Sequence, residues 1–280
     1  MFETGNVYTV KFDPALNSPR RMKSGRLLME NSQSPSQVYL SAAQSALNRI
    51  DTESVMRAAG VVAEAIGGGG IVHLFGSGHS SLLAQEVFYR AGGLIAINPV
   101  LDPRLGFERG AVESTEFERS LEGAEELAAK AGFQAGDAGI VISNSGRNAL
   151  PVEMALRMKH AGMKVIALTN FEQSRSSESR HPMGKRLFEV ADEIIDNHCP
   201  RGDAAVTIPG IPHAIGPLST LVGAAILHSV LMEAAASLVR KGVSPGVLAS
   251  ANVGNVTPLS VRQQLSAYAG RIRYYREGGR

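Results

Sequence analysis

The chain has 280 residues, of which 44% are hydrophobic and 19% charged, and its formal net charge is +2. These values are ordinary for a globular protein that is long enough to bury a substantial core. Lys and Arg are spread along the chain, so we expect no nucleic-acid partner. The single cysteine, Cys199, excludes an internal disulfide and indicates a reducing compartment. It lies in a polar loop without the neighbours of a nucleophile or zinc ligand, so we expect a bystander thiol.

No apolar run reaches the length of a membrane span, and the first residues lack the basic and apolar regions of a secretory signal. We therefore expect a cytoplasmic protein with no membrane partner. Residues 1–36 carry no sustained period and are expected to form a poorly ordered N-terminal extension. Residues 37–262 show no composition break and are predicted to form one domain. Residues 263–280 are expected to be a basic C-terminal tail.

Strand and helix patterns alternate from residue 38 onward. Thr52 is the expected N-cap of a helix that runs to residue 66. The predicted strands are 71–75, 94–97, 138–142, 164–168 and 193–196, and the later predicted helices are 81–91, 119–131, 149–161 and 217–240. Most of the strands are continuous apolar runs, which is typical of parallel strands buried on both faces. The pattern predicts an α/β fold, a three-layer sandwich around a parallel sheet.

Two predicted strands end in small-residue turns that lead directly into helices. The first strand runs into Gly-Ser-Gly-His-Ser at residues 76–80, and the third runs into Ser-Asn-Ser-Gly-Arg-Asn at residues 143–148. A strand, a tight turn and a helix direct backbone N–H groups and a positive helix end at an anion. The sequence therefore predicts a small anionic ligand held between two turns. The long polar connection at residues 170–186 is either a lid over this ligand or a solvated loop.

These two turns, with a final helix that opens at Pro-Leu-Ser-Thr (residues 217–220), resemble the sugar isomerase, or SIS, domain. The resemblance covers residues 38–260 and is closest to stand-alone SIS proteins that have no settled substrate. It implies a five-stranded parallel sheet of flavodoxin-like order 2-1-3-4-5, a sugar phosphate as ligand, and a homodimer or homotetramer. That order places the first and third strands side by side, so both turns meet at the switch point of the sheet.

The resemblance also implies roles for the two turns. The second turn is expected to bind phosphate, through Ser143, Asn144, Ser145, Gly146, Arg147 and Asn148. The first turn and the start of the final helix are expected to contact sugar hydroxyls, through Gly76, Ser77, Gly78, Ser80, Ser219 and Thr220. Asn148 stands where the family usually has Ser or Thr, and its amide is a comparable donor.

Aldose–ketose isomerisation requires a group that moves a proton between C1 and C2 of the sugar, commonly a carboxylate or a histidine. The candidates are His79, Glu86, Glu108 and His228. His79 either transfers protons or only binds hydroxyls, since a neutral imidazole does both. Glu113, His213 and Glu233 are weaker alternatives. For each of these groups the alternative is a surface charge or a satisfied core residue.

The first hypothesis is thus a sugar-phosphate aldose–ketose isomerase. A second is a phosphosugar lyase, because Glu-Gly-Ala-Glu-Glu at residues 122–126 resembles a segment of the N-acetylmuramic acid 6-phosphate etherases, where Glu122 or Glu125 would act. A third is a non-catalytic phosphosugar sensor. No cofactor is expected, because the first turn lacks the third glycine of a dinucleotide site. No metal is expected either, because no close-spaced ligand pair is present.

Overall fold

The computed structural model describes residues 12–13, 18–19, 27–28, 34–250 and 258–276. Its centre is a five-stranded sheet in the order β5-β4-β6-β7-β8, and every pair of neighbours is parallel. The strands are β4 (Val72–Gly76), β5 (Ile97–Pro99), β6 (Ala138–Ile142), β7 (Lys164–Thr169) and β8 (Glu193–Asp196). Numbered from β4, this order is 2-1-3-4-5, as expected.

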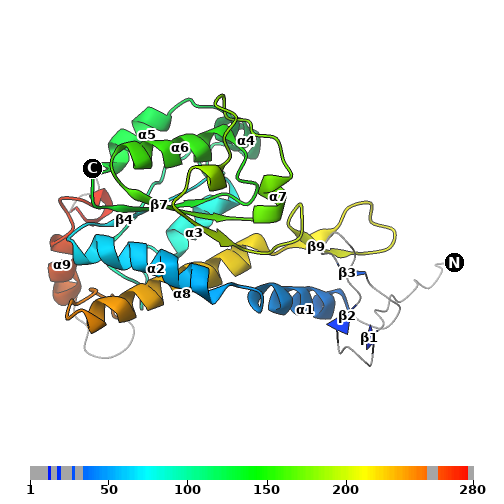
Figure 1. Ribbon diagram of the computed structural model, residues 1–280, viewed down its shortest axis with the longest axis horizontal. Helices are drawn as coiled ribbons and strands as arrows, with labels where there is room; N and C mark the ends of the chain where they lie inside the picture. Colours follow the sequence, from blue (N-terminus) through cyan, green and yellow to red (C-terminus); the bar gives the residue numbers. More distant parts are fainter. Residues whose placement is uncertain (1–11, 14–17, 20–26, 29–33, 251–257, 277–280) are drawn as a thin grey trace.

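Helices cover both faces of this sheet (Figure 1). One face carries α2 (Thr52–Gly67), α3 (His79–Glu86) and α8 (Ser219–Arg240), and the other carries α4 (Ala111–Arg119), α5 (Ala124–Ala131) and α6 (Ala149–His160). Alternate residues of one strand enter opposite cores, because side chains of a strand point to its two faces in turn. In β6, Ile140 and Ile142 pack with α2 and α8, whereas Val141 packs with α6. This confirms the predicted three-layer α/β sandwich.

The predicted helix 81–91 is shorter than expected, and the strand after it starts later. Helix α3 ends at Glu86, and Tyr89 adopts a φ of 45°. The chain then pairs with a distant segment, because Gly92 N–H donates to the Leu248 carbonyl and Leu248 N–H donates to the Gly93 carbonyl. This long-range pairing competes successfully with the local helical spacing, and β5 begins only at Ile97.

Two further boundaries differ from the predictions. The helix expected at 119–131 begins only at Ala124, as α5, after a turn in which Gly123 adopts a φ of 79°. The separate helix α4, which ends at Arg119, was not predicted. The N-cap of α2 is Asp51 rather than Thr52, because its carboxylate accepts hydrogen bonds from the N–H groups of Glu53 and Ser54.

A second, small sheet lies beside the amino end of α8. It contains β3 (Leu27–Leu28), β9 (Ala204–Thr207) and β10 (Ile215–Pro217) in the order β10-β9-β3. Helix α1 (Pro35–Leu47) is joined to it by a hydrogen bond of 2.8 Å from Tyr39 Oη to the Pro217 carbonyl. Two short strands, β1 (Phe12–Asp13) and β2 (Ser18–Pro19), pair with each other. Most of the expected extension 1–36 lies outside the described residues.

The C-terminal segment follows α9 (Pro258–Ser266) and ends in a 3-10 turn, η2 (Arg273–Tyr275). Ile272 is fully buried, and Tyr275 Oη donates a hydrogen bond of 3.0 Å to the Ile95 carbonyl. Arg273 reaches the Leu101 carbonyl at the other end of β5. This segment therefore packs along the edge strand of the sheet. The expected boundary at residue 263 stays a prediction.

Helix α8 has the length and composition of a membrane-spanning helix. One side of it is nevertheless built into the core, with Val222, Ile226, Val230 and Leu238 buried. A core helix of a globular domain passes the same compositional test, so this helix carries no membrane assignment.

Candidate functional site

The two small-residue turns lie side by side at the carboxyl edge of the sheet. Gly76, the last residue of β4, is in register with Ile142, the last residue of β6. The turns that follow therefore start at the same level on neighbouring strands. This is the switch point of the sheet, because β4 connects to β5 on one side and β6 connects to β7 on the other, and open α/β sheets bind their ligands in the crevice at such a point.

The second turn presents backbone donors without partners. Ser143 Oγ accepts a hydrogen bond of 3.2 Å from Gly146 N–H, which holds the turn closed. Within the described ranges, the N–H groups of Ser145, Arg147 and Asn148 have no protein acceptor. Helix α6 begins immediately afterwards, and its positive end adds to the field of these donors. The arrangement is suited to an anion.

The side chain of Asn148 is already engaged at both ends. Its Nδ2 donates to Glu118 Oε1 at 2.6 Å, and its Oδ1 accepts from Arg180 at 2.8 Å. Arg180 also donates its backbone N–H to the Arg147 carbonyl at 2.8 Å. The connection that carries Arg180 thus packs against the turn, and its role as a lid stays a prediction. The Asn148 amide is turned toward these protein groups, and its role as a phosphate ligand stays a prediction.

Three arginines gather beside this turn. Partial burial lowers the pKa of Arg180 below its ordinary value, and the nearby guanidinium groups of Arg147 and Arg119 lower it further. In the described part of the chain, Arg147 Nε is buried without a hydrogen-bond acceptor. Glu118 is the carboxylate whose charge offsets this effect on Arg180. The local field is therefore positive where the free N–H groups lie.

The first turn is fixed by a neighbouring connection. Gly78, with a φ of 56°, donates its N–H to the Leu105 carbonyl at 2.7 Å. His79 opens α3, and its exposed ring lies edge-on to Phe107 with centroids 4.8 Å apart. No hydrogen bond or ion pair engages the imidazole among the residues that the structure describes. Ser77 is buried and Ser80 half-buried. His79 is thus available to a ligand in the crevice.

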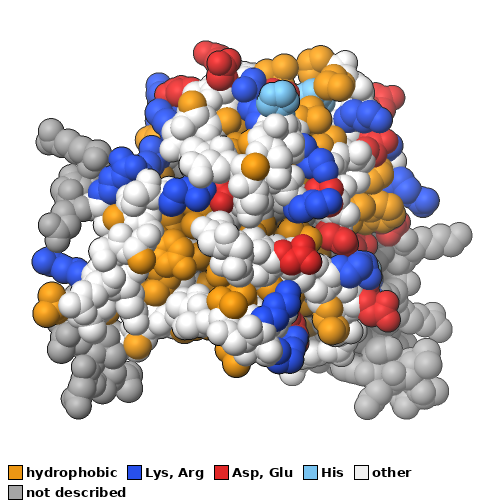
Figure 2. All heavy atoms as spheres, turned by 60° about the vertical axis from the view of Figure 1, so that its left-hand side comes forward, with side chains coloured by type: hydrophobic (Ala, Val, Ile, Leu, Met, Phe, Trp, Pro, Cys, Tyr) orange, Lys and Arg blue, Asp and Glu red, His pale blue; other side chains and the backbone are white. Residues whose placement is uncertain are grey.

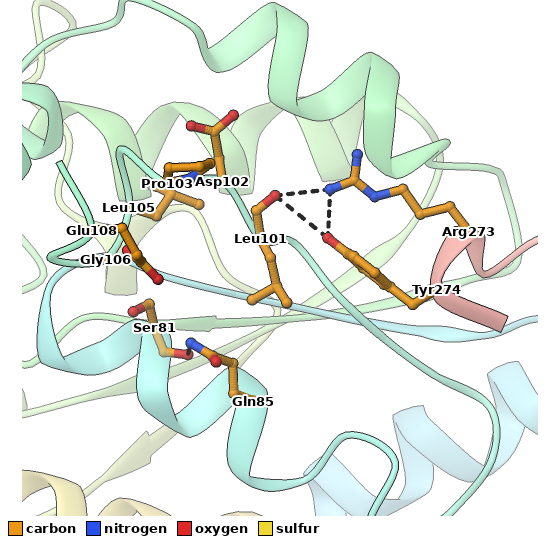
Figure 3. Close-up of a pocket in the computed structure, with 10 residues that line it drawn as sticks. All are labelled: Ser81, Gln85, Leu101, Asp102, Pro103, Leu105, Gly106, Glu108, Arg273 and Tyr274. Atoms are coloured by element: carbon orange, nitrogen blue, oxygen red, sulfur yellow. Dashed lines mark hydrogen bonds between the residues drawn. The ribbon is translucent and has the colours of Figure 1, made fainter. Parts of the chain in front are cut away.

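A cavity of about 280 Å³ adjoins the first turn (Figure 3). It lies between α3, the connection after β5 and the C-terminal segment, and is lined by Ser81, Gln85, Leu101, Asp102, Pro103, Leu105, Gly106, Glu108, Arg273 and Tyr274. Glu108 lies on the side of the cavity formed by Gly106 and Ser81. Its carboxylate has no hydrogen-bond or ion-pair partner in the described ranges, whereas Glu113 on the same connection pairs with Arg109 at 2.9 Å.

Two other predicted catalytic residues contact each other away from this crevice. Glu86 Oε1 lies 3.4 Å from His228 Nε2 and also pairs with Arg90. Seven residues separate Glu86 from His79 along α3, which corresponds to about 10 Å. The structure therefore brings Glu86 and His228 together but does not bring them to the two turns.

The start of α8 is organised by a carboxylate that local sequence patterns did not reveal. Asp203 accepts hydrogen bonds from Ser219 Oγ at 2.6 Å and from Ser219 N–H at 2.7 Å. The Ser219 hydroxyl is therefore engaged within the protein, whereas Thr220 is exposed. Asp203 lies 16 residues before Ser219, which is too far for a capping motif to be recognised.

Four further predicted groups lie at the surface. His213, Glu122, Glu125 and Glu233 are exposed. No group of three or more His, Cys, Asp or Glu residues is placed to hold a metal in the part of the chain described. Burial raises the pKa of the Cys199 thiol to about 12. Such a thiol is not a nucleophile at neutral pH.

Comparison with known proteins identifies the family of the chain. The family model described as the SIS domain matches residues 38–170, so the chain is an SIS-domain protein. A UPF0309 protein of Geobacillus kaustophilus is 40% identical over 228 residues, which cover 81% of this chain and 90% of that relative. A UPF0309 protein of Listeria innocua is 42% identical over 210 residues, covering 74% and 85%. The chain belongs to the UPF0309 family.

Solved structures are more distant in sequence. The phosphoheptose isomerase of Neisseria gonorrhoeae is 17% identical with a TM-score of 0.43, and the match covers 69% of this chain and 90% of that chain. A structure from Bacteroides fragilis, described as a phosphosugar isomerase of capsule formation, is 18% identical with a TM-score of 0.48 and covers 75% and 91%.

Proposed function

We propose that this protein binds a sugar phosphate across the carboxyl ends of β4 and β6 and interconverts its aldose and ketose forms. The observation that carries the proposal is the set of free donors in the second turn. The N–H groups of Ser145, Arg147 and Asn148 have no protein acceptor in the described chain, and they lie at the positive end of α6. A phosphate on these donors also lies next to the three arginines. The sugar hydroxyls then face the first turn, residues 76–80.

The chemistry requires one proton to move between carbons and another between oxygens. We assign the first to Glu108, whose carboxylate is unengaged by any described residue beside the first turn. It removes the C2 proton of the aldose and returns it to C1 of the enediol. His79 is assigned the transfer between O2 and O1, because a neutral imidazole both donates and accepts. No cofactor enters this scheme.

Glu86 and His228 are the competing assignment. Their mutual contact and the pairing of Glu86 with Arg90 engage the Glu86 carboxylate within the protein. A base engaged in this way, two helical turns from His79, is less suited to meet the substrate. Glu108 is therefore the preferred base.

The test is deuterium incorporation at C2 when pentose, hexose and heptose phosphates are incubated with the protein in D2O. We expect exchange and an isomeric product with at least one of them. Glu108→Gln is expected to lower the exchange rate by about 10²- to 10⁴-fold, the usual contribution of a general base. Glu113→Gln is the matched control, since it removes a carboxylate from the same connection that is paired with Arg109.

Other results would contradict the isomerase assignment in distinct ways. Loss of a substituent from C3 without an isomeric product would identify a lyase. Saturable thermal stabilisation by a sugar phosphate without either reaction would identify a sensor. An equal loss of exchange in Glu113→Gln and Glu108→Gln would remove Glu108 as the base.

We also propose that the protein acts as a homodimer or homotetramer, with the outer side of α8 at an interface. This helix buries one apolar side in the domain and leaves Leu221, Met232 and Val239 exposed on the other. An apolar stripe of this kind is suited to association with a second copy. Light scattering is expected to give a multiple of the 29.6 kDa chain mass. Met232→Asp is expected to lower the measured mass toward that of a single chain.

A further inference from the structure

The second turn is attached to the ends of the next two strands through a single residue, Asn144. Its backbone carbonyl accepts a hydrogen bond of 3.0 Å from the N–H of Asn170, which directly follows β7. Its side-chain Oδ1 accepts a hydrogen bond of 2.8 Å from Nδ2 of Asn197, which directly follows β8. Strands β6, β7 and β8 are consecutive neighbours in the sheet. The loop after β8 therefore reaches across β7 to hold the turn after β6.

The orientation of the Asn197 amide is fixed by the backbone. Asn197 is 3% exposed, and its Oδ1 accepts a hydrogen bond of 3.0 Å from the N–H of Cys199. His198, between them, adopts a φ of 51°, which is uncommon for a residue other than glycine and gives the chain this short return. A backbone N–H can only donate, so the oxygen of the amide must face Cys199 and Nδ2 must face Asn144.

The orientation of Asn197 in turn determines that of Asn144. Because Asn197 Nδ2 is a donor, Asn144 must present its oxygen to it, and the planar amide then directs Asn144 Nδ2 away from Asn197. This Nδ2 has no acceptor among the residues that the structure describes, and the Asn144 side chain is half-buried. It is therefore a further free donor in the turn where three backbone N–H groups are already without protein acceptors.

We infer that Asn197 is a positioning residue of the anion site, which acts through Asn144 to hold the Asn144 Nδ2 donor toward the bound phosphate. Asn197 orients the amide and makes no contact with the ligand. Without this contact, Asn144 turns its oxygen to the ligand as readily as its nitrogen, and an amide oxygen repels an anion. The inference rests on the proposed function, because it uses a phosphate at the second turn.

The experiment is a double-mutant cycle on the full-length protein, in which the Kd of inorganic phosphate is measured by calorimetry. Asn144→Ala and Asn197→Ala are each expected to raise Kd at least fivefold. The double variant is expected to bind phosphate within twofold of Asn144→Ala, because Asn197 has no donor left to orient. A merely structural role of Asn197 would instead raise Kd by the same factor in both backgrounds.

The salt concentration of the titration is set by the surface of the protein. The face shown in Figure 2 carries Lys and Arg side chains as well as Asp and Glu side chains, so phosphate also meets exposed positive groups there. Titration at about 0.15 M salt suppresses such contacts, since screening weakens interactions with exposed charges.

Asn98→Ala is the matched control. Asn98 is also 3% exposed, and its Nδ2 donates to His73 Nδ1 at 3.0 Å and to the Ala131 carbonyl at 3.2 Å, within β5 and away from the turn. Asn98→Ala and Asn197→Ala are both expected to lower the thermal unfolding temperature, because each removes hydrogen bonds of a buried amide. Only Asn197→Ala is expected to raise Kd.

Asn197→Asp is the second variant, for the case that Asn197→Ala does not fold. It keeps an acceptor for the Cys199 N–H but cannot donate to Asn144. It is expected to raise Kd more in the presence of Asn144 than in the Asn144→Ala background, where only the repulsion by its charge remains. Equal effects in the two backgrounds, or an unchanged Kd in Asn197→Ala, would overturn the inference and leave the proposed function intact. Failure of the wild type to bind phosphate would count against both.

Discussion

Asn148 Nδ2 donates a hydrogen bond of 2.6 Å to Glu118 Oε1, and this contact places a carboxylate beside a turn built for an anion. The Glu118 charge opposes a bound phosphate, while the nearby arginines attract it. Glu118→Gln keeps an acceptor for Asn148 and removes the charge. We expect sugar phosphates to bind about two- to fivefold more tightly, because one charge interaction at a half-buried, solvent-accessible site is worth about 0.5–1 kcal/mol.

The effect should shrink at high salt, since screening weakens interactions between exposed charges. Titration calorimetry at two ionic strengths measures both quantities. Weaker binding in Glu118→Gln would mean that the carboxylate positions Asn148 more than it repels the ligand.

Ser145 has no hydrogen-bond partner among the described residues, and its hydroxyl is assigned to the phosphate. Ser145→Ala is expected to weaken the binding of every phosphorylated ligand by about 1.5–3 kcal/mol, the value of a hydrogen bond to a charged group. This corresponds to about a 10- to 150-fold rise in Kd. Ser176→Ala, on the exposed connection, is the control and should leave Kd unchanged. Unchanged affinity in Ser145→Ala would refute the phosphate assignment.

Gly146 adopts a φ of 59°, and a Cβ at this position would lie 2.5 Å from Ser174 Oγ. Gly146→Ala therefore combines a left-handed backbone with a steric clash. Gly132 is the matched control, because its φ is 68° and a Cβ there meets open space. We expect Gly132→Ala to cost about 1–2 kcal/mol of stability, the backbone effect alone.

The Gly146→Ala variant should lose more stability than this and should also lose ligand affinity, because the clash displaces the second turn. Chemical denaturation and calorimetry measure the two effects. Equal destabilisation of the two variants with retained binding would show that the turn tolerates a side chain.

Asp137 anchors the amino edge of the sheet. Burial opposes its ionisation, but hydrogen bonds from His73 Nε2, the Ile71 N–H and Arg271 outweigh burial and lower its pKa below the ordinary 3.8. Because the folded state binds this proton less readily than the unfolded chain, its contribution to stability is present above pH 3.8 and is lost as the pH falls below it.

Asp137→Asn should therefore lower the free energy of unfolding near neutral pH by about 1–3 kcal/mol, the cost of leaving buried donors poorly paired. The difference from the wild type should narrow below pH 3.8. Denaturation curves from pH 7 to pH 3 test this. A difference that is independent of pH would contradict the assigned ionisation.

The five strands and the two turns were predictable because their signals are local, and the resemblance to the SIS domain implied the order of the strands. Continuous apolar runs marked the buried parallel strands, and small residues marked the turns where backbone must approach closely. Gly76 illustrates this, since a Cβ there would lie against the Ser80 carbonyl. The end of α3 was predicted wrongly because Gly92 and Gly93 pair with a segment far along the chain.

The sequence by itself determined the sandwich and the positions of both turns, since these depend on periodicity and short-range backbone geometry, whereas the strand order was implied by the resemblance to the SIS domain. Only the tertiary structure decided which groups meet around them. It paired Glu86 with His228, left Glu108 unengaged by described residues, joined Asn148 to Glu118 and Arg180, and made Tyr274 a wall of the cavity. These contacts join side chains from separate elements, and a sequence pattern fixes neither their distance nor their burial.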